Sequence, residues 1–139
     1  MSIKKSSLMV IAVIIAVTVF SFLTSGGNAM LIDMSDTSIS FSGIDDFRHE
    51  VAYSDIVSVS LEDVPYWERW GGHEFGNFRV GHITGASSDG RNESYVLFAT
   101  IQADRVIIAN LSDGSQMVFN YNNNSDTEAI YNMLLENLQ

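Results

Sequence analysis

The feature that most constrains this chain is a long uncharged stretch near its N-terminus. Lys4 and Lys5 are followed by no charged residue until Asp33, and residues 8–23 (LMVIAVIIAVTVFSFL) are almost entirely apolar. A helix of that length spans about 24 Å, whereas the whole uncharged window, residues 6–32, is long enough to cross a hydrocarbon layer of about 30 Å. Apolar side chains surround such a helix and leave no polar face for water. We therefore expect a segment that enters the membrane.

Two interpretations of this segment stay open. Residues 1–29 form either an uncleaved anchor that contacts the bilayer through residues 8–24, or a cleavable signal peptide with small residues at 27–29 (GNA) before the cut. In both cases the lysines lie on the N-terminal flank, so the positive-inside rule keeps the N-terminus in the cytoplasm. We expect residues 30–139 to form one domain outside the cytoplasm, held at the cell membrane by a single pass, or secreted if the leader is cleaved.

The remaining chain is acidic and contains no cysteine. All 17 acidic residues lie beyond residue 32, together with five arginines and no lysine, so this part has a formal charge of 5 − 17, or about −12. That charge repels nucleic acids and anionic lipids, which proteins bind through lysine and arginine, so we expect no nucleic-acid partner. The lack of cysteine excludes a disulfide framework, a thiolate nucleophile and a cysteine-based zinc site.

Strand signals recur along the acidic part of the chain. Alternating apolar and polar residues predict seven strands, over residues 37–42, 48–53, 56–61, 77–83, 93–100, 105–111 and 116–121. In the third of these we expect Val57, Val59 and Leu61 to share one face of a sheet. Asp-Gly pairs at 89–90 and 113–114 predict tight turns, because such pairs accept the positive backbone angles of hairpins.

The last segment changes to a helical period. Ser125 and Glu128 form a capping-box pattern that predicts a helix over residues 125–138. Its apolar stripe contains Ala129, Ile130, Met133, Leu134 and Leu138. The expected fold class is mainly β (α+β), with a seven-strand meander that closes into a bent barrel and the helix covering its open end.

Several short motifs carry a resemblance to known proteins. They are residues 39–43 (ISFSG), residues 53–61 (YSDIVSVSL), a loop containing Gly71, Gly72 and Gly76, residues 106–108 (VII) and residues 113–120 (DGSQMVFN). In this order, before a C-terminal helix, they resemble the bacterial pleckstrin-homology (PH) domain families, whose members commonly follow membrane segments. The resemblance implies a PH-like barrel and a membrane-associated interaction module, and it implies no reaction.

One loop departs from the lipid-binding members of the PH fold. Those members place basic residues around the first hairpin loop, whereas here that loop reads GIDDF at residues 43–47. Two aspartates repel a phosphate, and Arg48 alone does not replace a basic cluster. We therefore do not expect phosphoinositide binding.

The most unusual segment, residues 63–78, holds the chain's only proline and both of its tryptophans. We expect Tyr66, Trp67, Arg69 and Trp70 to form a contact surface for a protein partner. The aromatic rings would supply buried area, and the arginine a charge-assisted hydrogen bond. The alternative is that these rings fold back to seal an open edge or end of the barrel.

The sequence offers little for catalysis. It has no HExxH, GxSxG, phosphate-binding glycine loop or EF-hand pattern, so we expect no enzyme, catalytic residue, cofactor or bound metal. The main expectation is a membrane-anchored, non-catalytic interaction module. One alternative is a small metal-dependent hydrolase in which His73, Glu74 and His82 converge if the aromatic segment folds over the fourth strand. Another is a structural part of an envelope assembly that pairs through an exposed sheet edge.

Overall fold

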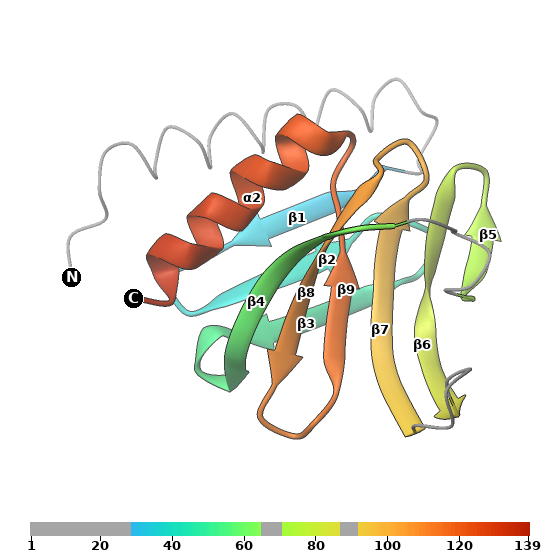
Figure 1. The fold of residues 1–139 in the computed structure, drawn as a ribbon. Helices are drawn as coiled ribbons and strands as arrows, with labels where there is room; N and C mark the ends of the chain where they lie inside the picture. The colour runs from blue at the N-terminus through green and yellow to red at the C-terminus, as the bar shows by residue number, and fades with distance from the viewer. Residues whose placement is uncertain (1–28, 65–70, 87–91) are drawn as a thin grey trace. The chain divides into compact units, whose positions relative to one another are not determined.

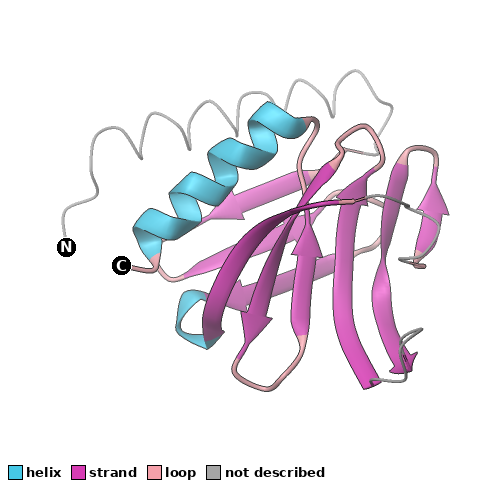
Figure 2. Cartoon of the chain, in the orientation of Figure 1, coloured by secondary structure: helices cyan, strands magenta, loops and turns pink. Residues whose placement is uncertain are grey.

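The structure, a computed structural model, describes residues 29–64, 71–86 and 92–139 (Figure 1). The described residues form nine strands, a short 3-10 helix η1 (Tyr53–Asp55) and one α-helix (Figure 2). Backbone packing divides the chain into two compact units, Met1–Tyr53 and Ser54–Gln139. The prediction of a mainly β fold with a C-terminal helix is therefore confirmed.

The first unit contains a three-stranded antiparallel sheet. Its order is β1 (Leu31–Met34), β2 (Ser38–Ser42) and β3 (Arg48–Ala52). The alternation predicted for β2 is observed, because Ile39 and Phe41 are buried while Ser40 and Ser42 between and after them stay partly exposed. Successive side chains of a strand point to opposite faces, so this sheet has one apolar face and one polar face.

A glycine allows close packing at the start of this sheet. Gly43 has a φ of 97°, and a Cβ atom there would lie 2.1 Å from the carbonyl oxygen of Ala29. The Ala29 N–H in turn donates to the Gly43 carbonyl at 3.1 Å, and Ala29 is buried. Only glycine combines this backbone conformation with so close a contact. Ala29 therefore belongs to the folded sheet.

The second unit contains a six-stranded sheet in the order β4-β8-β9-β7-β6-β5. Four of its five neighbouring pairs are antiparallel, whereas β9, which lies between β8 and β7, runs parallel to β7. The bounds are β4 (Ile56–Asp63), β5 (His73–Phe75), β6 (Phe78–Ala86), β7 (Asn92–Thr100), β8 (Arg105–Leu111) and β9 (Gln116–Phe119).

The positions of the strands along the chain were predicted well, whereas their order in the sheets was not. All seven predicted strands are present, with ends within three residues of the prediction, and β1 and β5 are additional. The predicted meander and closed barrel are wrong for the described residues. These form two sheets, and the second sheet ends in two different edge strands, β4 and β5.

A β-bulge interrupts β4. The register with β8 shifts between Ile56 and Ser58, and Val57 at this point is 70% exposed. The prediction that Val57 lies on a common buried face with Val59 and Leu61 is therefore wrong, since an extra residue in a bulge breaks the alternation of faces. Val59 and Leu61 are partly buried.

The predicted turn at residues 113–114 is confirmed. Gly114 has a φ of 88°, and the Asp113 carboxylate accepts hydrogen bonds from the Ser115 hydroxyl at 2.6 Å and the Ser115 N–H at 2.9 Å. These bonds lower the pKa of Asp113, because they stabilise its ionised form. The other Asp-Gly pair, at residues 89–90, lies outside the described residues.

The C-terminal helix, α2 (Asn124–Asn137), begins and ends one residue before the predicted positions. Its N-cap is Asn123, whose side-chain oxygen accepts a hydrogen bond from the Asp126 N–H at 2.9 Å. The predicted cap at Ser125 is wrong, although both residue types can fill this role. The predicted apolar face is confirmed at its centre, where Ile130 and Leu134 are buried, and the helix packs against β4 and β8.

The predicted membrane segment, residues 8–24, lies outside the described residues. Within the part of the chain that the structure does describe, no helix is both long enough and apolar enough to cross a bilayer.

Candidate interaction surface

The four predicted contact residues, Tyr66, Trp67, Arg69 and Trp70, all lie outside the described residues. The structure does describe both ends of the segment that contains them. At the first end, Val64 is buried and its N–H donates to the carbonyl of Asp104 at 2.8 Å. Its side chain belongs to an apolar cluster on one face of the six-stranded sheet, made by Val64, Leu97, Ala99, Val106 and Val118.

The second end of this segment lies against the same face. Gly71 and Gly72 have φ values of 73° and 83°, which favour glycine. A Cβ atom on Gly72 would lie 3.3 Å from the Leu97 side chain and 3.0 Å from the carbonyl oxygen of Val80, and one on Gly71 would lie 3.9 Å from Ile83. Leu97 therefore underlies both described ends. We call this side of the six-stranded sheet the loop face.

A row of uncharged side chains crosses the loop face. The strand registers align one residue from each of five strands, namely Ser58, Asn110, Gln116, Tyr95 and Ile83. The side-chain amide of Asn110 donates to the Ser58 hydroxyl at 3.0 Å. The side-chain amide of Gln116 donates to the side-chain oxygen of Asn110 at 2.8 Å. The row is polar at its β4 end and apolar or aromatic at its β6 end. Tyr95 and Ile83 are partly exposed and pack against the buried cluster.

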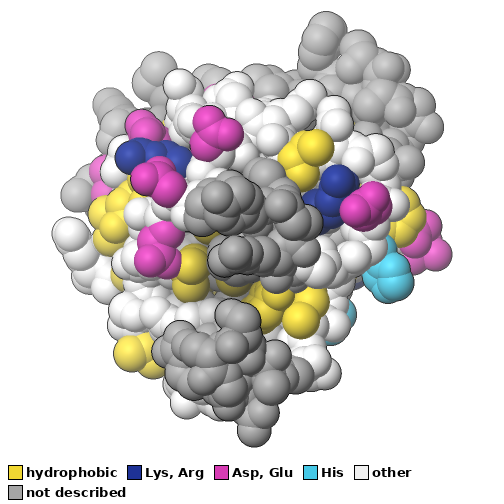
Figure 3. Space-filling view, turned by 45° about the vertical axis from the view of Figure 1, so that its right-hand side comes forward, with side chains coloured by type: hydrophobic (Ala, Val, Ile, Leu, Met, Phe, Trp, Pro, Cys, Tyr) yellow, Lys and Arg dark blue, Asp and Glu magenta, His cyan; other side chains and the backbone are white. Residues whose placement is uncertain are grey.

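Charged side chains are grouped separately from this row. Figure 3 shows them in two separate places on the face displayed, each with positive and negative groups together. Arg105 donates to Glu128 at 2.8 Å and to Asp63 at 3.2 Å, and so links β8 to both α2 and β4. Arg79 forms a longer ion pair with Glu74, at 3.7 Å. The side chains of Arg105, Asp63 and Glu128 are at least 40% exposed, so each Arg105 pair stabilises the fold by about 0.2–1 kcal/mol. The Arg79 side chain is only 16% exposed.

One buried polar side chain holds the corner next to Arg105. Asn120 is fully buried, and its side-chain oxygen accepts from the Thr100 N–H at 2.7 Å. Its amide nitrogen donates to the carbonyls of Thr100 at 3.0 Å and Arg105 at 3.2 Å. Thr100 ends β7 and Arg105 begins β8, so one side chain joins the ends of three neighbouring strands. This corner also carries the Asp104 carbonyl that binds Val64.

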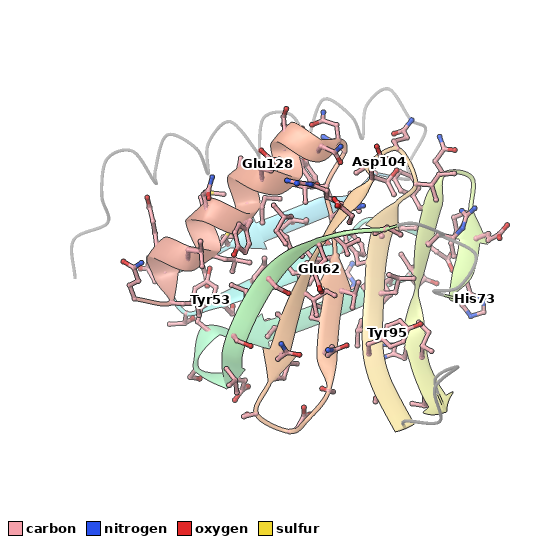
Figure 4. All side chains as sticks on the ribbon, in the orientation of Figure 1. Tyr53, Glu62, His73, Tyr95, Asp104 and Glu128 are labelled. Atoms are coloured by element: carbon pink, nitrogen blue, oxygen red, sulfur yellow. The ribbon has the colours of Figure 1, made fainter. Side chains whose placement is uncertain are left out.

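The structure does not bring together the three residues of the hydrolase alternative. In the β5–β6 register Glu74 lies opposite Arg79, whereas His73 lies opposite Val80, so the two side chains point to opposite faces. His82, two residues after Val80, is exposed like the other two (Figure 4 labels His73 at the β5 edge). Among the described residues, no group of three His, Cys, Asp or Glu side chains is placed to hold a metal ion.

Neither the uncharged row nor the buried position of Asn120 is predicted by the sequence. The row could have been anticipated only in part, since Ser58, Asn110 and Gln116 occupy alternating positions of predicted strands. Their alignment depends on β9 pairing with both β7 and β8, which strand periodicity does not reveal. Asn120 could not have been singled out, because a buried asparagine and a loop asparagine read identically in a sequence.

Comparison with known proteins returns no relative of this chain. No protein-family model matches it, and neither the curated proteins nor the solved structures contain a match. The resemblance to the bacterial PH-domain families therefore rests on the sequence motifs alone.

Proposed function

We propose that this chain is a membrane-anchored, non-catalytic module that binds a protein partner outside the cytoplasm. The observation that carries the proposal is that both described ends of the aromatic segment lie on the loop face, above a buried apolar cluster and beside a partly exposed uncharged row. Binding residues are commonly carried by loops that a rigid scaffold positions. Tyr66, Trp67, Arg69 and Trp70 remain the proposed contacts, with the row as a supporting surface.

The proposed anchor is supported by the sequence. Lys4, Lys5 and the apolar run at residues 8–23 have the order of an N-in, single-pass anchor. Only seven residues, 24–30, separate that run from the start of β1 at Leu31. Even fully extended, seven residues reach about 25 Å. An anchored module would therefore stay close to the membrane surface, where its acidic charge disfavours contact with anionic headgroups.

Membership of the bacterial PH-domain families is a further part of the proposal. Its support is the set of motifs at residues 39–43, 53–61 and 113–120, together with a β fold that ends in a helix. The parallel pairing of β7 with β9 differs from the antiparallel meander that these families imply.

The location is tested by fractionation of the full chain with a C-terminal tag, combined with its intact mass and protease treatment of spheroplasts. Membrane-bound protein of full mass whose domain is digested from outside is the expected result. A soluble product lacking residues 1–29 would replace the anchor with a cleaved leader. A domain protected inside spheroplasts would contradict the proposed topology.

The binding role is tested by chemical crosslinking in intact cells, with the double variant Trp67→Ala/Trp70→Ala. We expect discrete crosslinked adducts with the wild-type chain and their loss in this variant, because aromatic side chains contribute strongly to binding surfaces. Val57→Ser is the control, since Val57 is 70% exposed and lies on β4, outside the aromatic segment. Adducts with a different protein that survive the tryptophan substitutions would contradict the assignment of the aromatic segment.

A further inference from the structure

Strand β3 forms one edge of the three-stranded sheet and pairs with β2. Just beyond it, the Tyr53 N–H donates to the carbonyl of Thr37 at 2.9 Å. In an antiparallel pair, alternate residues direct their main-chain N–H and C=O groups to the same neighbour. Tyr53 directs its N–H to β2, so the residues two and four positions before it also direct their main-chain groups to β2. These residues are Val51 and His49.

The other residues of β3 consequently direct their main-chain groups away from β2. These are Arg48, Glu50 and Ala52. The pairing of β1 with β2 agrees with this assignment, because the Ser35 N–H donates to the Ser38 carbonyl at 2.9 Å. Even-numbered residues of β2 therefore direct their main-chain N–H and C=O groups to β1, and odd-numbered residues direct theirs to β3. Among the described residues no strand pairs with this edge of β3, which thus offers the main-chain donors and acceptors of residues 48, 50 and 52.

The side chains on this edge carry opposite charges. Arg48 and Glu50 are both exposed, and they lie on the same face of the strand because they are two residues apart. Their partners on β2 are uncharged, because Arg48 lies opposite Ser42 and Glu50 lies opposite Ser40. Within the described part of the chain, neither Arg48 nor Glu50 forms an ion pair.

We propose that β3 pairs with β3 of a second copy of this chain, antiparallel about a two-fold axis at His49. In this register Arg48 of each copy lies opposite Glu50 of the other. These residues have outward-directed main-chain groups, so each pair can exchange two backbone hydrogen bonds. The same register places each guanidinium opposite a carboxylate, twice by symmetry, and joins the two sheets into one sheet of six strands.

Charge selects this register over its nearest competitor. Shifting the axis to residue 50 also pairs outward-directed groups, but it places Glu50 directly opposite Glu50 of the second copy, which is destabilising. Charged residues on an edge strand usually oppose pairing with other chains. Here their spacing makes the strand complementary to itself. Since exposed ion pairs are weak, we expect a weak dimer, favoured when chains are confined to one membrane.

The first test measures dimerisation of the full-length chain in detergent by sedimentation equilibrium. We expect a concentration-dependent dimer whose Kd rises about tenfold in Arg48→Glu and in Glu50→Arg, and returns toward the wild-type value in Arg48→Glu/Glu50→Arg. Glu136→Arg is the matched control, because it makes the same charge change on α2. A wild-type chain that stays monomeric, or a double variant no better than the singles, would overturn the proposal.

The second test determines the register by disulfide crosslinking. The chain contains no native cysteine, so only the introduced thiols can form a disulfide. The double variant Arg48→Cys/Glu50→Cys should form an intermolecular disulfide under mild oxidation, because directly opposed residues have suitable Cα separations. Neither single variant should crosslink efficiently, since residue 48 lies opposite residue 50. Efficient crosslinking of Glu50→Cys alone would show the competing register and refute the pairing about His49.

Discussion

The two sheets differ in how far along the chain their neighbouring strands lie. In the first sheet the order β1-β2-β3 follows the sequence, and short turns join neighbours. In the second sheet β4 pairs with β8, so that Ile56 lies opposite Leu111, and the β8–β9 hairpin is inserted between β4 and β7. The first arrangement needs only local alternation and turns. The second needs contacts that no turn supplies.

Different contacts fix the strand order in the two sheets. In the first sheet, the close approach at Gly43 and the backbone bonds beside the turns fix the register. In the second, Asn120 follows β9 and binds main-chain groups at the end of β7 and the start of β8. One buried side chain, that of Asn120, therefore supports the order β8-β9-β7 of the second sheet, whereas the close approach at Gly43 fixes the start of the first.

The largest expected effect comes from removing the Asn120 side chain. Asn120→Ala would leave three main-chain groups of Thr100 and Arg105 without their buried partner. We expect a loss of about 4 kcal/mol in the free energy of unfolding, because each unpaired buried group costs about 1–3 kcal/mol. Urea denaturation measures the total, and hydrogen exchange locates it. Protection should fall more in β7, β8 and β9 than in β1–β3.

Asn132→Ala, at an exposed site on α2, is the matched control for this substitution. We expect a change within about 0.5 kcal/mol. If Asn120→Ala were equally mild, or if its exchange rates rose evenly over both sheets, buried side-chain bonding would not be what distinguishes the second sheet.

The next largest effect tests the first sheet. Gly43→Ala would place a Cβ atom 2.1 Å from the Ala29 carbonyl oxygen in a left-handed conformation, so we expect a loss of about 3 kcal/mol. Gly114→Ala is the control, because Gly114 has a similar φ of 88° but no atom within 4 Å of the added Cβ. There we expect about 1 kcal/mol. Equal losses in thermal or urea denaturation would mean that the Ala29 contact contributes nothing.

A smaller effect concerns the end of the first sheet at high pH. The Tyr53 hydroxyl donates to the Ser35 carbonyl at 2.9 Å, and burial, followed by the charges of Asp33 and Asp36, raises the pKa of Tyr53 to about 12. Because the folded state holds this proton more tightly than the unfolded state, this stabilisation is complete below a pH of about 10 and is lost as the pH rises from about 10 to 12.

The variant Tyr53→Phe should cost about 1 kcal/mol at neutral pH, by removing this hydrogen bond. It should also be less sensitive than the wild-type chain to a rise from pH 9 to pH 11, which urea denaturation at both values can measure. Parallel pH dependence in the two proteins would exclude Tyr53 as the titrating group.

The smallest effect is expected at the surface of the second sheet. Arg105→Gln removes the ion pairs with Asp63 and Glu128, whose side chains are 83% and 49% exposed. We expect a loss of about 0.5 kcal/mol that shrinks in 1 M salt. Arg79→Gln does not test an ion pair alone, because the Arg79 guanidinium also donates to the carbonyls of Gly76 and Phe78, each at 2.9 Å. A salt-independent loss of several kcal/mol at Arg105 would mean that surface pairing, too, holds the nonlocal order.

The local elements of the fold could be predicted from the sequence, and the reasons are physical. The alternation of Ile39 and Phe41 with serines marks β2, and the apolar stripe through Ile130 and Leu134 marks α2. Strand β1 was hidden because it continues the uncharged N-terminal window. Strand β5 was hidden because its three residues lie among glycines. The insertion of β9 could not be predicted, since the same periodicity suits a central strand in any order.

The candidate surface was predictable only as a segment of unusual composition. The tryptophans singled out residues 63–78, and the structure adds that Val64 and Gly72, at the described ends, both lie near Leu97. The uncharged row arises from three registers acting together, through residues such as Asn110 and Gln116. No spacing in a linear sequence encodes such an alignment.

The inserted β9 strand also has a consequence for the order of synthesis. Strands β4 and β7 are complete once residue 100 has been made, but the hairpin between them comes from residues 105–119. Until that hairpin emerges, the six-stranded sheet lacks its middle, and strands with open edges invite pairing with other chains. The first sheet, by contrast, has all of its strands by residue 52. A chain that emerges N-terminus first would thus carry one finished sheet and one divided sheet until residues 105–119 appear.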